Sequence, residues 1–323
     1  MSRDGTWSFR PGFAICVALA CTAGLGAVPS EAHAGAWTLE EGRIWGKAAL
    51  LYLRSDRIFA DTNDERFGLM GCTDGAGNPV QIGLGDRRPY DCLTGGTFQV
   101  AALYFDVTVG IVDRWDFTVQ VPVILDVSFR NESGLDGSDA GLSDIRLGTK
   151  FRILQEPMVL SVAAEVKLPT GDFTTDEAVP PLGEGQFDLG LQVLVGKGFE
   201  YGWVGGDVGW RFRLTNPDTR INVGDELLAN VEGGIKPLAW LAIPLGVDLL
   251  YGMESQEEGV PTSRPRRWVM HVRGGLLFSV TEFLHLEASV RWPVAGAGWP
   301  ADPIWSFGVM GETPPLWRIG ESN

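Results

Sequence analysis

Residues 141–154 read GLSDIRLGTKFRIL, residues 158–171 read MVLSVAAEVKLPTG, and residues 185–199 read GQFDLGLQVLVGKGF. In each segment apolar residues alternate with polar or small ones for about ten residues, which is the period of a β-strand rather than of a helix. One short and one long connection join the three strands. Strands of this length and alternation predict part of a transmembrane β-barrel.

The same alternation continues on both sides of this region. Residues 97–111 place Phe105 and Val107 on one face and Asp106 and Thr108 on the other, and a second alternating segment follows the turn at Asp113. Strands of a soluble parallel sheet are apolar on both faces, so this pattern favours antiparallel strands between a lipid face and a polar face. Residues 43–54 are also strand-like, but they do not indicate which face is outside.

Connections alternate in length along the chain. Those near residues 113, 155, 200, 238 and 280 are a few residues long, whereas those at 55–96, 129–141, 170–185, 215–225, 252–265 and 294–303 are longer and mostly acidic. This places tight turns at one end and long loops at the other, as in outer-membrane barrels. We therefore predict an all-β fold, an antiparallel up-and-down barrel of about twelve strands with both ends in the periplasm, formed by Arg43–Arg54, Phe98–Ile111, Trp115–Val127, Asp144–Ile153, Met158–Leu168, Gln186–Gly198, Gly202–Leu214, Glu226–Pro237, Trp240–Tyr251, Arg267–Ser279, Glu282–Pro293 and Ile304–Gly311.

Aromatic residues gather at the predicted strand ends. Amphipathic rings favour the membrane–water interface, so they are expected to form two girdles around the barrel. The alternative is a soluble, secreted all-β sandwich whose core these rings cap. The residues are Trp115, Trp203, Trp240, Phe283, Trp292 and Trp305.

The N-terminus has the features of an export signal. Arg3 and Arg10 precede an apolar run at residues 13–28, and Ala32-His33-Ala34 supplies small residues for cleavage before Gly35. A retained anchor, or a lipoprotein signal at Cys21, are the alternatives. The predicted organisation is a signal peptide at 1–34, a barrel at 35–311 and a periplasmic tail at 312–323.

Net charge, cysteine content and loop spacing limit the functions and sites that this chain can have. The 323 residues carry a formal charge of −15, which disfavours binding to nucleic acid. Cys72 and Cys92 remain after the leader and share one loop, so a disulfide is expected in an exported chain. The acidic loops do not have the spacing of a calcium-binding loop, and neither a metal nor a cofactor is expected.

Charged residues of both signs occupy the face opposite the predicted lipid face. They either line a pore or compensate one another inside a partly filled barrel. The predicted lumen residues are Arg146, Lys150, Arg152, Glu165, Lys167, Asp188, Asp207, Arg211, Arg213, Glu232, Lys236, Arg273, Glu287 and Arg291, together with Asp106, Asp116, Gln120, Asp248 and His271.

No enzymatic activity is expected. His271 and His285 are the histidines that follow the predicted leader, and both are predicted to point inward. A serine hydrolase requires a nucleophile and a histidine with an orienting acid. Ser289 and Glu287 share a face with His285, but that face is the predicted lumen.

Several short motifs resemble those of outer-membrane barrels named for the meta-pathway of phenol degradation, relatives of channels for fatty acids and aromatic hydrocarbons. The resemblance covers roughly Phe98 to Ser279, and similar motifs occur in the barrel half of OmpA-like proteins. It rests on Gly141–Asp144, Lys150–Arg152, Lys167–Asp172, Val112–Trp115 and Val121–Val123.

The chain departs from that pattern at both ends. The last predicted strand is followed by a tail instead of ending on an aromatic residue, and residues 35–43 contain no evident plug segment of the kind found in the hydrophobic-compound channels.

Motifs and resemblance together predict a passive channel or porin-like transporter in the outer membrane of a Gram-negative cell, for small molecules that include hydrophobic or aromatic ones. A structural or adhesive barrel with a filled lumen and acidic surface loops is the alternative. The expected partners are outer-membrane lipid and lipopolysaccharide, and the barrel-assembly machinery during insertion.

Overall fold

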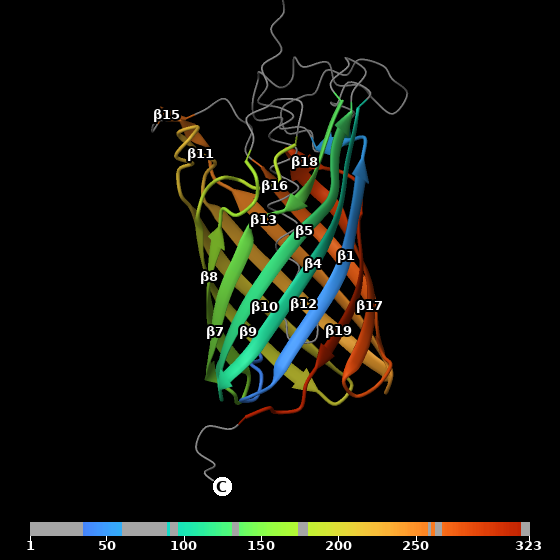
Figure 1. Cartoon of the computed structure of the whole chain (residues 1–323). Helices are drawn as coiled ribbons and strands as arrows, with labels where there is room; N and C mark the ends of the chain where they lie inside the picture. Colours follow the sequence, from blue (N-terminus) through green and yellow to red (C-terminus); the bar gives the residue numbers. More distant parts are fainter. Residues whose placement is uncertain are drawn as a thin grey trace, which may run out of the picture.

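The computed structural model describes residues 35–59, 89–90, 96–130, 136–173, 180–257, 260–261 and 267–317. These residues form one upright barrel (Figure 1). Among them, no helix is long and apolar enough to cross a membrane.

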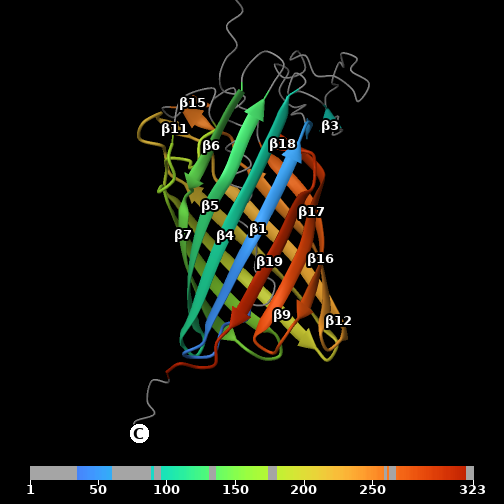
Figure 2. The ribbon, with the colours of Figure 1, turned by 45° about the vertical axis from the view of Figure 1, so that its right-hand side comes forward.

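Twelve strand positions make up the barrel wall, each antiparallel to its neighbours. Strand β19 pairs with β1 from Leu53↔Ile304 to Trp45↔Glu312 and closes the sheet (Figure 2). The wall strands are β1 (Ile44–Ser55), β4 (Thr97–Val112), β5 (Trp115–Arg130), β7 (Ile145–Leu154), β8 (Val159–Leu168), β9 (Asp188–Phe199), β10 (Gly202–Arg213), β12 (Glu226–Leu238), β13 (Leu241–Gly252), β16 (Trp268–Ser279), β17 (Leu284–Ala297) and β19 (Ile304–Glu312).

Connection lengths alternate as predicted. Tight turns at residues 113–114, 155–158, 200–201, 239–240 and 280–283 lie at one end, here called the tight-turn end. The opposite, long-loop end carries two small sheets (Figure 1). One contains β2 (Ile58–Phe59), β3 (Pro89–Tyr90) and β18 (Trp299–Pro300), and the other contains β11 (Ile221–Asn222), β14 (Gln256–Glu257) and β15 (Val260–Pro261).

The predicted loop at 129–141 was partly wrong. Strand β5 continues to Arg130, and β6 (Asp136–Leu142) pairs with its upper half, above the part that pairs with β7. The two segments share one wall position, and Asp144 lies at the break between them. Strand β6 is not predicted because its sequence, DGSDAGL, has no alternating apolar residues.

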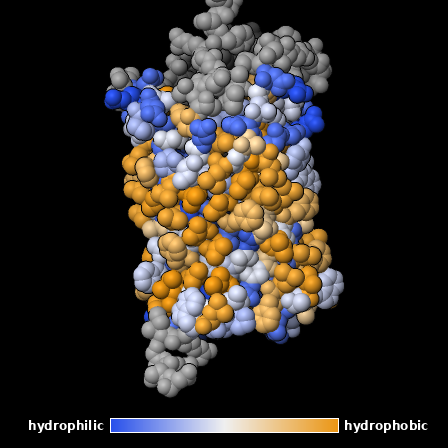
Figure 3. Space-filling view, in the orientation of Figure 1, coloured by the Kyte–Doolittle hydropathy of each residue, from blue (hydrophilic) through white to orange (hydrophobic). Residues whose placement is uncertain are grey.

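The outer surface is apolar around the middle of the barrel and hydrophilic at the long-loop end (Figure 3). On β4, Phe105 and Val107 are exposed on the outer wall, whereas Asp106 and Thr108 are buried inside. A band of exposed aliphatic and aromatic side chains that surrounds a polar interior is the arrangement required by lipid.

This polarity is inverted where β1, β4 and β5 approach the long-loop end. Leu53, Phe98 and Val127 are fully buried in an apolar cluster inside the barrel, while Gln99 donates a hydrogen bond to Asp126 on the outer face, at 2.9 Å. Strands β4 and β5 each contain 16 residues, more than the 9–11 that span a bilayer. In the part of these strands nearest the long-loop end, apolar side chains therefore face inward and polar ones face outward, as in a soluble protein.

Most of the predicted girdle aromatics are exposed on the outer wall, and one prediction was wrong. Trp115, Trp240 and Phe283 are exposed at the tight-turn end. Trp203, in contrast, shares the inward parity of Asp207 and lies over Gly234, where an added Cβ would be 2.1 Å from the ring. Glycine provides the space for this ring, a contact between strands that sequence spacing does not reveal.

Candidate functional site

The first part of the N-terminal segment (residues 35–43) lies inside the barrel, from Gly35 to Leu39, which corrects the expectation that no such segment is present. Ala36 and Leu39 are fully buried. The backbone N–H of Leu39 donates to the Asp116 carboxylate at 3.0 Å, and Ser161 donates to the carbonyl of Ala36. Sequence periodicity does not reveal this segment, because its hydrogen bonds to the wall are made by its backbone atoms.

The segment narrows the lumen near the tight-turn end. The ring of Trp37 lies on Gly196, where an added Cβ would be 2.6 Å from a ring carbon. On the tight-turn side of the segment is a cavity of about 390 Å³, here called the lower cavity. It is lined by Trp37, Trp203, Lys236 and His285, among others. The Lys236 ammonium lies 5.8 Å from the centre of the Trp203 ring.

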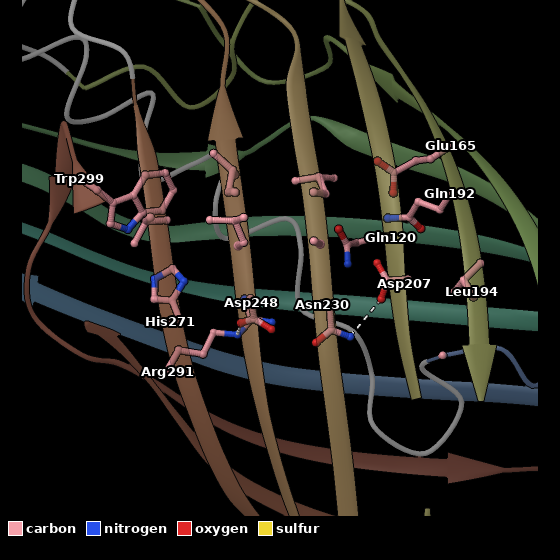
Figure 4. A pocket seen from close by; sticks show the side chains of 16 residues that line it. Gln120, Glu165, Gln192, Leu194, Asp207, Asn230, Asp248, His271, Arg291 and Trp299 are labelled. Atoms are coloured by element: carbon pink, nitrogen blue, oxygen red, sulfur yellow. Dashed lines mark hydrogen bonds and ion pairs between the residues drawn. The ribbon is translucent and has the colours of Figure 1, made fainter. Parts of the chain in front are cut away.

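A second cavity, of about 220 Å³ and here called the upper cavity, lies on the long-loop side of the segment. Figure 4 shows the side chains that line it. Gly35 borders it, and its carbonyl accepts a hydrogen bond from Lys150 at 3.2 Å. The lining includes Gln120, Gln192, Asp207, Asn230, Asp248, His271, Arg291 and Trp299.

A network of buried ion pairs lies closer to the long-loop end. Lys167 is 3.3 Å from Asp144 and 3.0 Å from Asp188, and it also donates to Glu184. Arg213 contacts Glu184 as well and lies 3.6 Å from Asp188. Glu184 comes from the connection after β8, so the network ties that connection to the inside of the wall.

Glu226 joins three arginines to the same network. Its carboxylate lies 2.7 Å from Arg211, 3.0 Å from Arg213 and 2.5 Å from Arg267. Four basic groups thus face four carboxylates, with Asp144, Glu184 and Asp188 completing the set. Burial by itself would raise the pKa of Glu184, but Arg213 and Lys167 outweigh that effect and hold its pKa well below the usual range.

Further pairs occupy the middle of the lumen. Arg146 contacts Glu165 at 2.6 Å, and Arg291 lies 3.5 Å from Asp248. Arg273 contacts Glu232 and lies 3.5 Å from Asp248. Lys47 pairs with Glu287, a partner that the sequence missed because the faces of β1 were ambiguous.

The structure places the predicted lumen residues as follows. Those buried within the barrel are Arg146, Lys167, Asp188, Arg211, Arg213, Glu232, Arg273, Glu287 and Arg291, and the half-buried ones are Lys150, Arg152, Glu165 and Asp207. Lys236 is exposed at the tight-turn end. Cys72, Cys92 and the predicted leader lie outside the described residues.

The histidine and serine considered for hydrolysis have separate partners. His285 Nδ1 lies 3.0 Å from Ser279 Oγ, whereas Ser289 donates to Glu287 at 3.0 Å. Within the described ranges, no cluster of His, Cys, Asp or Glu could hold a metal ion.

A closed antiparallel barrel with an apolar outer belt and a charged interior defines an integral outer-membrane β-barrel. The chain belongs to the family described as "Putative MetA-pathway of phenol degradation", which matches residues 89–303. The family resemblance of the sequence motifs is thus confirmed. Among curated proteins, no match to the chain is found.

The fold is also similar to that of a solved structure. An outer membrane channel from Pseudomonas putida F1 superposes with a TM-score of 0.66 at 18% identity, over 86% of this chain and 98% of that one. The NanC porin gives 0.45 at 7% identity, over 67% and 94%. The CymD monoaromatic hydrocarbon channel gives 0.41 at 9% identity, over 85% and 89%.

The buried network predicts a large effect of Arg213→Met. Removing this guanidinium leaves the carboxylates of Glu184 and Glu226 in excess inside the barrel, so we expect the free energy of unfolding to fall by about 3–5 kcal/mol. Urea titration of the detergent-folded protein, followed by gel mobility without heating, measures the change.

Arg130→Met is the matched control. Arg130 and Asp136 form an ion pair at 3.1 Å whose side chains are mostly exposed, so the loss is expected to stay below about 1 kcal/mol. Equal losses in both variants would show that the buried network does not stabilise the barrel.

The low pKa of Glu184 also predicts how the free energy of unfolding changes with pH. A carboxylate with a depressed folded-state pKa contributes stability at neutral pH, and that contribution is lost as pH falls below the unfolded value of about 4.3. In Glu184→Gln, the decline in unfolding free energy below this pH should therefore be shallower than in the wild type.

Proposed function

We propose that this protein is a passive outer-membrane channel for small molecules, including hydrophobic or aromatic ones. The observation that carries the proposal is the pair of cavities of about 220 and 390 Å³ inside one barrel, on either side of the N-terminal segment. A filled structural barrel is the second candidate, and the compensated ion network favours it.

The similar structures add circumstantial support. The barrel from Pseudomonas putida F1 is itself described as an outer membrane channel, and this chain shares its fold. The family description names phenol degradation, which is consistent with aromatic cargo.

In this proposal the pore is lined below the segment by Lys236 and above it by groups that border the upper cavity, such as Asp207, Glu165 and Arg291. Arg152 lies on the inward face of β7 toward the tight-turn end. Lys167, Arg211 and Arg213 instead hold the wall and its inner connection together. In this proposal these three residues stabilise the barrel around the pore and do not line it.

The proposal also includes export and assembly. The tight-turn end faces the periplasm together with the tail at 312–323, and the acidic loops face the outside. Outer-membrane lipid, lipopolysaccharide and the barrel-assembly machinery are its partners, and Cys72 pairs with Cys92. An intact mass that does not shift by two hydrogens on reduction would contradict this disulfide.

Signal cleavage after Ala34 would make Gly35 the first residue of the mature protein. Gly35 lies close to Glu232, since an added Cβ on Gly35 would be 3.4 Å from Glu232 Oε1. Intact-mass measurement of protein purified from outer membranes should give a chain that begins at Gly35. A chain that still carries residues 1–34 would rule out cleavage.

Conductance in planar bilayers tests the channel. We expect discrete single-channel steps for the wild type and larger steps for Trp37→Ala, because this ring narrows the lumen against Gly196. Trp240→Ala removes a Trp from the outer wall and should leave the steps unchanged. If neither Trp37→Ala nor Trp240→Ala gives single-channel steps although both are folded, the filled barrel is favoured.

Ion selectivity tests the lining at the tight-turn end. Lys236→Glu should shift the reversal potential toward cations, since Lys236 borders the lower cavity. Lys197→Glu makes the same charge change on the exposed outer face of β9 and serves as the control. Identical reversal potentials for Lys236→Glu and the wild type would place Lys236 outside the conducting path.

A further inference from the structure

After β19 the chain continues along the tight-turn end of the barrel, past the start of β1 (Figure 1). The Thr313 N–H donates to the carbonyl of Ile44 at 2.8 Å, and Thr313 Oγ1 accepts from the N–H of Ile44 at 3.0 Å. The Leu316 N–H donates to the carbonyl of Gly42 at 2.9 Å. Three hydrogen bonds thus join residues 313–317, here called the tail segment, to residues 42–44.

Gly42 is held from two sides. Its N–H donates to the carbonyl of Gly110 at the end of β4, at 2.9 Å, while its carbonyl accepts from Leu316. Its φ is +79°, a conformation that favours glycine, and a Cβ at this position would clash with the backbone of Trp317. Position 42 therefore fits between the wall and the tail segment only as glycine.

An ion pair strengthens the same contact. The Arg43 guanidinium donates to the Glu312 carboxylate at 2.8 Å and to the Glu40 carboxylate at 2.9 Å. Glu312 is the last residue of β19, so this pair joins the end of the wall to the N-terminal segment. Because the Arg43 and Glu40 side chains are partly exposed, the pair contributes less to the contact than the hydrogen bonds between the backbones.

The sequence of the tail segment is suited to this contact. Pro314 and Pro315 lie between the two residues that donate to residues 42–44. Proline has no N–H to satisfy, and its fixed φ keeps the chain extended. A segment that is already extended loses little conformational entropy when it docks.

The contacted residues lead directly into the lumen. The Arg43 N–H donates back to the carbonyl of Glu40 at 3.2 Å, which turns the chain at the rim of the barrel. Inside the rim, Leu39 packs with Trp45 and Met310 and donates its N–H to the wall. Trp37 is two residues further in, so the contacts at the rim limit how far its ring can move.

We infer that the tail segment is a strap that fixes the N-terminal segment at the tight-turn end and thereby holds Trp37 in the lumen. Release of the strap frees residues 35–43 and widens the lumen at this ring. The widening rests on the proposed channel function, whereas the strap does not.

Hydrogen–deuterium exchange of the detergent-folded protein tests the strap. The double change Thr313→Val with Leu316→Pro removes the hydroxyl acceptor for Ile44 and the N–H donor to Gly42, and it keeps the length of the chain. Without these two hydrogen bonds the segment should open more often, so we expect exchange at residues 36–43 to become about tenfold faster. Mass spectrometry of the peptides that cover these residues measures the change.

Leu316→Ala is the matched control. It retains the backbone N–H and shortens a side chain that is 61% exposed, so exchange should equal that of the wild type. Peptides from β10, which does not contact the strap, report any loss of overall stability, and gel mobility without heating verifies folding.

Unchanged exchange at residues 36–43 in the folded double variant would overturn the strap, and so would equal acceleration in Leu316→Ala. Acceleration confined to residues 42–44 would show that the tail segment does not hold Trp37, which also overturns it.

Conductance tests the widening separately. We expect the double variant to give larger single-channel steps than the wild type, as for Trp37→Ala. Faster exchange at residues 36–43 without channel steps in any protein would support the strap and contradict the channel. Faster exchange with steps of wild-type size would contradict the widening.

Discussion

Backbone hydrogen bonding inside lipid is the constraint on which this structure depends. A strand edge within the bilayer would expose N–H and C=O groups that no water can satisfy. Pairing of β1 with β19 removes both edges. Once the wall is closed, the side-chain period of two forces every second residue into the interior, so closure also determines which groups share the lumen.

The enclosed charges then determine the internal organisation. A buried ionised group is tolerated when opposite charges and hydrogen bonds compensate its lost hydration. Lys167 on β8 and Arg213 on β10 lie on either side of β9, and their shared partner Glu184 lies on a connection folded into the barrel. The ion pairs therefore fix a loop as well as the wall, which narrows the lumen toward the long-loop end.

At the other end the lumen is narrowed by packing instead of charge. The N-terminal segment crosses the inside of the barrel before β1 begins, and Trp37 fits where Gly196 leaves space. Between this ring and the ion network lies the upper cavity, which is bordered by apolar residues such as Leu250 and Trp299 and by polar ones such as Asn230 and Asp248. The two restrictions bound this cavity along the barrel axis.

The sequence by itself determined the barrel, the alternation of turns and loops, and the inward parity of residues such as Arg146, Asp188 and Arg273, because these follow from periodicity along one strand. Tertiary structure alone decided the inward position of Trp203, the strand at 136–142, the Lys47–Glu287 pair, the internal N-terminal segment and the cavity between Gln120 and His271. Each of these depends on contacts between strands far apart in the chain, and local periodicity carries no information about distances across a lumen.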